Sequence, residues 1–180
     1  MPEIPKATGY TGTAKLLHWL IVLLLITQFI FAFTMPHIGR STPVTTLISL
    51  HFNFGMIILA VVVMRLARRA AHGEPTPCPG LPPWQVQLAR IIHWALYALL
   101  FVLPVLGWMN ASWRGMPMVM FGYELPKLMP TRTPGWGWTG DAHTVLACYL
   151  TLTLVALHVA TALYHYFVRR DGVLQRMLPG

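Results

Sequence analysis

The sequence predicts an all-α integral membrane protein, a four-helix bundle that forms one domain over residues 1–180. Hydrophobic residues make up 56% of the chain and charged residues only 10%, whereas a soluble domain carries about 25% charged residues. Four apolar runs of about 20 residues are long enough to cross a bilayer. A helix is the expected form of each run, because it satisfies its own backbone hydrogen bonds in lipid.

The four runs are expected to form helices over residues 16–35, 44–66, 86–109 and 143–168. Pro104 is expected to kink the third helix near one end. Residues 110–140 form the long loop between the third and fourth helices. Because residues 116–128 are still fairly apolar, we expect this loop to lie on the membrane surface and to cap the outer end of the bundle, with a short interfacial helix as one form that it could take.

The basic residues predict the orientation of the bundle. The chain has 13 Lys and Arg against 5 Asp and Glu, a net charge of +8. The basic residues gather at the ends of the apolar runs, which argues against nucleic-acid binding and for membrane topology. Nine of them lie on the side of the chain termini, among them Lys6, and the other side holds Arg40, Arg114, Lys127 and Arg132. The positive-inside rule therefore predicts that both termini are cytoplasmic and that the 110–140 loop lies outside.

The histidines are the candidate functional residues. Of eight histidines, His37 and His72 lie in loops, and the other six lie in or at the ends of the apolar runs: His18, His51, His93, His143, His158 and His165. Ionisable groups in a membrane are costly, and they usually face the bundle interior with a partner. A hydrogen bond between helices accounts for one such histidine, but six in four helices favour a stronger cause.

Their spacing places imidazoles at two heights. His143 and His158 are separated by about 22 Å of helical rise and roughly 60° of rotation, so they point broadly the same way. His51 lies at the outer height on the second helix, and His18 lies at the inner height on the first. Haem needs one axial ligand on each face, so this pattern favours two stacked haems in the bundle core. By depth alone, His165 competes with His158 as the partner of His18. The alternative is that the first helix begins earlier, near Thr11 or Thr13, either of which could cap it, and that His18 therefore lies deeper in the bilayer.

Metal sites of different kinds fit the histidines less well. Zinc prefers about four nitrogen or sulfur ligands at one centre, and a di-iron bundle needs several glutamates. Beyond the N-terminal tail the glutamates are Glu74 and Glu124, and both lie in loops. A single haem, another metal, or histidines that only hold the helices together remain the alternatives to two haems.

Short motifs recur around these histidines along nearly the whole chain: Leu17-His18-Trp19, Leu50-His51, Ile92-His93-Trp94, Ala142-His143, Leu157-His158 and His165-Tyr166-Phe167. Phe121-Gly122 and Leu125-Pro126 in the outer loop, and residues 171–179, add to them. Together they resemble the bacterial cytochrome b561 family, whose members are four-helix, di-haem proteins of the inner membrane. The resemblance implies that His18 and His158 bind one haem b, and that His51 and His143 bind a second.

The resemblance also implies a quinone as one redox partner, and superoxide as the electron donor of some members. We therefore expect an oxidoreductase that carries electrons across the inner membrane from superoxide to ubiquinone. His165 and His93 are left over after haem ligation, and they are the candidates for catalytic quinone or proton contacts, because histidine titrates near neutral pH. A hydrogen-bonded packing role is the alternative for each of them.

Two other function classes remain. The first is a cytochrome subunit that passes electrons to or from a protein redox partner, such as a hydrogenase or a formate dehydrogenase. The outer loop of about 30 residues offers such a partner little surface. The second is a non-redox bundle, such as a transporter or an assembly factor, which predicts a colourless protein. The basic residues on the outer side fit either a field that gathers superoxide or ordinary membrane-surface charge.

Overall fold

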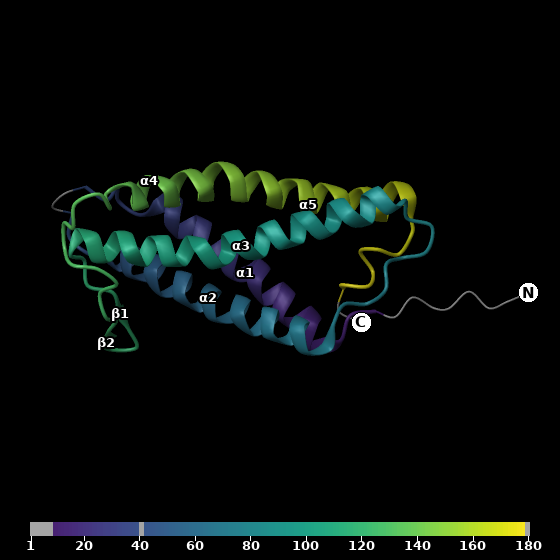
Figure 1. Cartoon of the computed structure of the whole chain (residues 1–180), viewed down its shortest axis with the longest axis horizontal. Helices are drawn as coiled ribbons and strands as arrows, with labels where there is room; N and C mark the ends of the chain where they lie inside the picture. The colour runs from purple at the N-terminus through teal and green to yellow at the C-terminus, as the bar shows by residue number, and fades with distance from the viewer. Residues whose placement is uncertain (1–8, 40–41, 179–180) are drawn as a thin grey trace, which may run out of the picture.

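The computed structural model describes residues 9–39 and 42–178, so Lys6 and Arg40 lie outside the described residues. The helices form an elongated bundle (Figure 1), with both ends of the described chain at one end and a small hairpin at the other. We call these the termini end and the hairpin end. The elements are α1 Gly12–Thr34, α2 Thr46–His72, α3 Pro83–Arg114, β1 Val119–Met120, β2 Tyr123–Glu124, α4 Trp138–Val145, the π-helical turn η1 Leu146–Thr151, α5 Leu152–Tyr164 and the π-helical turn η2 His165–Arg169.

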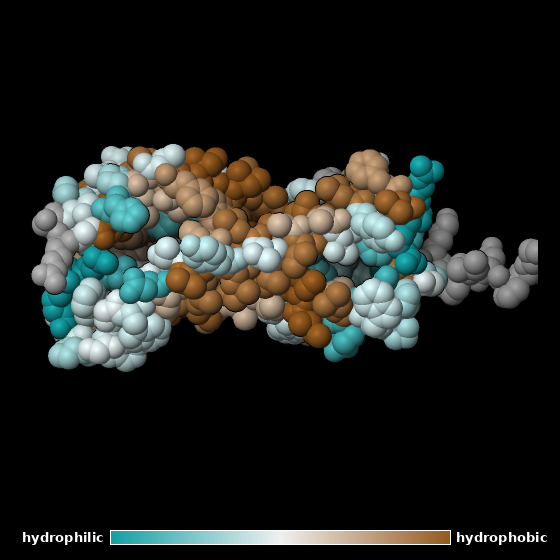
Figure 2. Space-filling model, turned by 90° about the horizontal axis from the view of Figure 1, so that it is seen from above, coloured by the Kyte–Doolittle hydropathy of each residue, from teal (hydrophilic) through white to brown (hydrophobic). Residues whose placement is uncertain are grey.

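The predicted four-helix membrane fold is confirmed. Among the described residues, four helices are long and apolar enough to cross a bilayer, the last running through α4, η1, α5 and η2. Figure 2 shows a hydrophobic middle with hydrophilic residues gathered toward both ends. Large apolar side chains on α1 are more than half exposed at helical spacing: Leu16, Leu23, Ile26, Ile30 and Phe33. We expect lipid to cover this face, because apolar side chains are stable in contact with hydrocarbon and do not need to be buried in the protein.

The spanning helices differ from the predicted bounds because local capping decides where they begin and end, and each one extends beyond its predicted range at one end or both. The Thr11 hydroxyl accepts a hydrogen bond from the Ala14 N–H, so α1 begins at Gly12 rather than at residue 16. Pro83 opens α3 at the first helical position, where its missing N–H costs nothing. Gly115 ends α3 with φ 75°, a conformation that favours glycine. Pro104 lies inside α3 as expected.

The outer loop holds a hairpin where the sequence predicted an interfacial helix. β1 and β2 pair antiparallel through Met120 and Tyr123, with Phe121 and Gly122 at the turn in the left-handed region. The loop is fixed to α3 because the Trp108 indole donates to the Pro126 carbonyl. The helix prediction was wrong because positive φ at two successive residues gives a tight hairpin turn, and apolar composition alone does not distinguish a helix from such a hairpin.

The core lies between the first three helices. One buried cluster joins α1, α2 and α3 around Ile21, Leu24, Ile58, Val62 and Leu100. The fourth span is different, since α4, η1 and α5 lie against α3. Over the described residues, none of their Cα atoms comes within 8 Å of a Cα atom of α1 or α2. The first three helices are therefore packed together, whereas the fourth span is separated from α1 and α2.

The fourth span is not a regular α-helix. The wide turn η1 separates α4 from α5 and lies between the two histidine heights. A π turn winds fewer degrees per residue than an α turn, so the rotation between His143 and His158 differs from the roughly 60° that a regular helix would leave. Such turns cluster at functional sites. No residue pattern in this segment had indicated one.

Candidate functional site

At the hairpin end, two histidines face one another across the open side of the bundle. The ring centroids of His51 on α2 and His143 on α4 are 6.1 Å apart, and the ring planes cross at 81°. Both side chains are half-buried. The two helices that carry them keep their backbones apart, so these imidazoles bridge the separation.

At the termini end, three histidines gather at one height. The ring centroids of His18 on α1 and His158 on α5 are 6.3 Å apart, with the planes at 67°. His93 on α3 lies closer to His158, at 5.3 Å. The structure thus brings His18 opposite His158, and places His93 beside the pair.

These distances test whether an iron fits between the rings. Metal–imidazole bonds are about 2 Å long and the ring centre lies roughly 1 Å beyond the bonded nitrogen, so two axial imidazoles on one metal have centroids about 6 Å apart. The pairs His51–His143 and His18–His158 match this spacing. The pair His93–His158 is about 1 Å too close. A macrocycle also needs width between the helices, and the backbones stay apart on this side of the bundle.

The nitrogens of the hairpin-end pair are in contrasting surroundings. Nδ1 of His143 lies 2.8 Å from the Leu103 carbonyl oxygen. On the opposite ligand candidate, Nδ1 of His51 is buried and has no hydrogen-bond partner within the described part of the chain, and the same is true of Oε1 of the neighbouring Gln28. A buried polar atom that lacks a partner is rare in folded proteins. The two orphaned polar atoms at His51 therefore fit a site that is built to hold a further group.

The histidines do not form a multidentate site of the zinc type. Within the described ranges, no three His, Cys, Asp or Glu side chains are grouped closely enough to hold one metal ion. The imidazoles are arranged as opposed pairs, which is the ligand set of a flat macrocycle with two axial positions.

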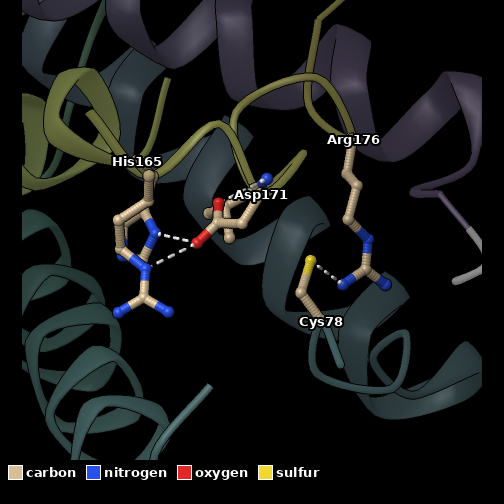
Figure 3. A network of polar contacts seen from close by, with 6 residues as sticks. Cys78, His165, Asp171 and Arg176 are labelled. Carbon is tan, nitrogen blue, oxygen red and sulfur yellow. Dashed lines mark hydrogen bonds and ion pairs between the residues drawn. The ribbon is translucent and has the colours of Figure 1, made fainter. Parts of the chain in front are cut away.

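His165 belongs to a separate polar network at the termini end (Figure 3). It is buried, and its Nδ1 donates to Oδ2 of Asp171 at 2.6 Å. The Arg169 guanidinium donates to the same oxygen at 3.1 Å. Since His165 pairs with Asp171 and His158 faces His18, depth alone would have been a poor guide to the partner of His18.

The sequence reasoning missed Asp171. It lies six residues after His165, just past the helix end, and Arg170 in the left-handed conformation (φ 54°) ends the helix and turns the chain there. Burial raises the pKa of the Asp171 carboxyl, but hydrogen bonds from His165, the Val173 N–H and Arg169 outweigh it, so the pKa lies below its ordinary value. The carboxylate is therefore ionised at neutral pH and accepts the His165 proton donor. The Asp171-Gly172 pair, just after the end of the fourth span, was the sequence signal that could have indicated a turn with a carboxylate near His165.

Arginines of α2 hold the termini end together. The Arg65 guanidinium donates to the Tyr97 hydroxyl and to the Ala14 carbonyl, which links three helices. Arg69 lies over the Trp94 ring at 4.7 Å and pairs with Glu74 at 2.7 Å. These contacts fix α1, α2 and α3 around the cluster of His18, His93 and His158.

Comparison with known proteins decides the family. The family model described as prokaryotic cytochrome b561 matches residues 9–180 of the chain. The chain belongs to this family. Cytochrome b561 relatives cover nearly its whole length. It is 29% identical over 164 residues to the probable superoxide oxidase CybB of Yersinia pestis, with 91% of this chain and 92% of that protein aligned.

Two further relatives have other names. Cytochrome b561 homolog 1 of Escherichia coli is 23% identical over 171 residues, covering 94% of this chain and 97% of the relative. Cytochrome b562 of Cereibacter sphaeroides is 27% identical over 175 residues, covering 94% and 95%. The chain is thus a membrane electron-transfer protein of the cytochrome b561 family, and membership implies haem b as its cofactor.

Proposed function

We propose that this protein holds two b-type haems, one between His18 and His158 and one between His51 and His143, and carries electrons across the inner membrane from superoxide to ubiquinone. One observation carries the proposal. Two imidazole pairs, with centroids 6.3 Å and 6.1 Å apart, face one another between helices whose backbones stay apart. When bound, each haem supplies an iron that accepts and releases one electron at a time.

The direction of transfer follows from charge. The termini end holds Lys15, Arg90, the arginines of α2 and those of residues 169–176. These outnumber the basic residues of the hairpin end. The positive-inside rule therefore makes the termini end cytoplasmic and the hairpin end the outer, periplasmic end of the bundle. The hairpin-end pair is then the outer site and the termini-end pair the inner one.

The proposed reaction balances as two one-electron oxidations and one two-electron reduction. Two superoxide anions each lose one electron and become dioxygen. One ubiquinone gains both electrons and two protons and becomes ubiquinol. The relative named as a probable superoxide oxidase supports superoxide as the donor. The protein must therefore attract an anion at one end and supply protons at the other.

The hairpin end carries the charge that an anionic substrate requires. Arg114, Lys127 and Arg132 lie there, and Glu124 and Asp141 offset only part of their charge. Arg114 lines an open groove of about 420 Å³ and donates to the Gly39 carbonyl. Such a positive field raises the encounter rate of a small anion, and the effect weakens as salt rises.

The termini end carries the proton-handling groups. His165 donates through Nδ1 to Asp171, so Nε2 is the nitrogen left to take up or give a proton. Tyr166, Phe167, Arg170 and Gln175 line a neighbouring groove of about 380 Å³, although His165 itself does not line it. We assign His165 as the first proton contact of the quinone, and His93 as a second candidate beside the inner pair.

Replacing His165 with glutamine is expected to leave both haems in place and to slow quinone reduction by about 100-fold, the usual scale for one acid–base group. Stopped-flow reduction of a ubiquinone analogue at fixed haem content measures the effect. His72→Gln is the matched control, since His72 is an exposed histidine at the same end of the bundle. An unchanged rate in His165→Gln removes the proposed role.

The function itself is tested with purified protein, a superoxide source and a ubiquinone analogue. We expect two haems per chain in the visible spectrum, quinol formation that depends on superoxide, and a rate that falls as ionic strength rises. A coloured protein that reduces no quinone until a partner dehydrogenase or hydrogenase is added would indicate the electron-transfer subunit instead. A colourless protein would indicate a non-redox bundle.

A further inference from the structure

His143 is held against the backbone of the neighbouring helix. Its Nδ1 lies 2.8 Å from the carbonyl oxygen of Leu103 on α3. A carbonyl oxygen only accepts hydrogen bonds, so Nδ1 must carry the proton and donate it. The lone pair of the neutral ring is then on Nε2. Histidines that bind metals usually have this arrangement, because the second hydrogen bond fixes the tautomer and the ring orientation.

Gly107 lies one helical turn after Leu103, on the same face of α3. A Cβ atom at Gly107 would meet Cε1 of His143 at 3.2 Å and its Nδ1 at 3.3 Å. The imidazole therefore rests on the helix backbone in the space that any other side chain would fill. The two features act together, since Gly107 provides the clearance and the Leu103 carbonyl provides the bond.

The helices α3 and α4 are close enough for this contact because glycines also lie at the start of α4, where it packs against α3. A Cβ atom at Gly140, three residues before His143, would lie 2.8 Å from Oδ1 of Asn110. One at Gly137 would meet the Trp113 ring at 3.2 Å. The close approach of α3 and α4 at the hairpin end thus holds His143 at hydrogen-bonding distance from α3.

The opposite histidine lacks such a support. Among the described residues, Nδ1 of His51 is buried without a hydrogen-bond partner. Nε2 of Gln28 lies 3.5 Å from Nε2 of His51 and donates to the His51 backbone carbonyl. The two rings cross at 81°. The ring contact of His143 is the shorter one, at 2.8 Å against 3.5 Å for His51, so His143 is the more firmly held of the two rings.

We infer that Gly107 and the Leu103 carbonyl form a seat for His143 that fixes its tautomer and ring plane, and that this seat tunes the outer haem selectively. The inference rests on the proposed function, in which His143 is an axial ligand. Gly107 is a positioning residue, because it acts through the imidazole. Donation from Nδ1 makes the ligand more basic and stabilises the oxidised iron. Weakening that bond should raise the reduction potential of the outer haem.

Gly107→Ala tests the seat. The added methyl should tilt the His143 ring, shift the low-spin electron paramagnetic resonance signal of one haem, and raise the potential of that haem in a redox titration. The haem-to-protein ratio should stay unchanged. The inner haem serves as the internal standard, and Val102→Ala, at a partly exposed position on the same helix, is the matched control that should change neither signal.

The outcomes separate this inference from the proposed function. Wild-type protein without two haems removes the proposed function. Two haems with unchanged signals and potentials in Gly107→Ala overturn the seat alone. If Gly107→Ala does not fold, the wild type gives a second test by pulsed electron paramagnetic resonance after transfer to D₂O. The Nδ1 proton of His143, bonded to a carbonyl, should exchange more slowly than that of His51, and equal exchange would overturn the seat.

Discussion

Replacing His143 with alanine is expected to remove the outer haem and to leave the inner haem bound. His143 supplies one of the two imidazoles at the hairpin end, 6.1 Å from His51 between ring centroids. The inner pair lies on the far side of the π turn η1 and shares none of these side chains. His51→Ala should give the same result, since a haem held by two axial ligands loses its site when either one is removed.

The measurement is the haem-to-protein ratio, read with the reduced-minus-oxidised visible spectrum. The ratio should fall by half in both variants, and superoxide-dependent quinone reduction should stop. His37→Ala is the control, because His37 is an exposed histidine near the hairpin end. A folded protein that loses both haems in equal amounts would show that the two imidazole pairs are not independent sites.

Replacing His158 with alanine is expected to have the reverse effect and to abolish quinone reduction. His158 lies between two other imidazoles, with His18 at 6.3 Å and His93 at 5.3 Å. Only the first of these distances accommodates an iron between two rings, so His18→Ala should remove the same haem and His93→Ala should retain it. The outer haem should stay bound in all three variants.

This second prediction also decides which histidine is opposite His158. The haem-to-protein ratio of each variant and the number of steps in its redox titration measure whether the inner haem is retained. Retention of that haem in His18→Ala together with its loss in His93→Ala would make His93 the ligand and overturn the assignment. His165→Gln should resemble neither variant, because His165 is bonded to Asp171, away from the inner pair.

Much of the architecture follows from the sequence. The apolar runs predict four spans because lipid leaves the helix as the simplest way to satisfy a single backbone segment. The two heights of the histidines on the fourth span follow from the rise of about 1.5 Å per residue. Counting along the chain therefore gives the two heights of the histidines, whereas the division into ligands and spare histidines came from the family resemblance.

Counting along the chain could not show which histidines on different helices lie opposite one another. Whether His18 faces His158, His93 or His165 depends on how helices tilt and rotate against one another, which the periodicity of a single helix does not specify. The hairpin at Phe121 and Gly122 and the π turn η1 change the direction of side chains through local backbone geometry. Composition carries little information about either feature.

By itself, the sequence determined the spans and the residues that offer imidazole nitrogens at each height, because both depend on local spacing. The tertiary structure decided which imidazole rings lie opposite one another. It also decided which rings are held by a neighbour, as the Leu103 carbonyl holds His143 and as Asp171 holds His165. These contacts join residues from different helices, or join a helix to the turn beyond it. The distances of these contacts are set by how closely the segments pack. At Gly107 the lack of a side chain leaves room for the His143 ring against α3.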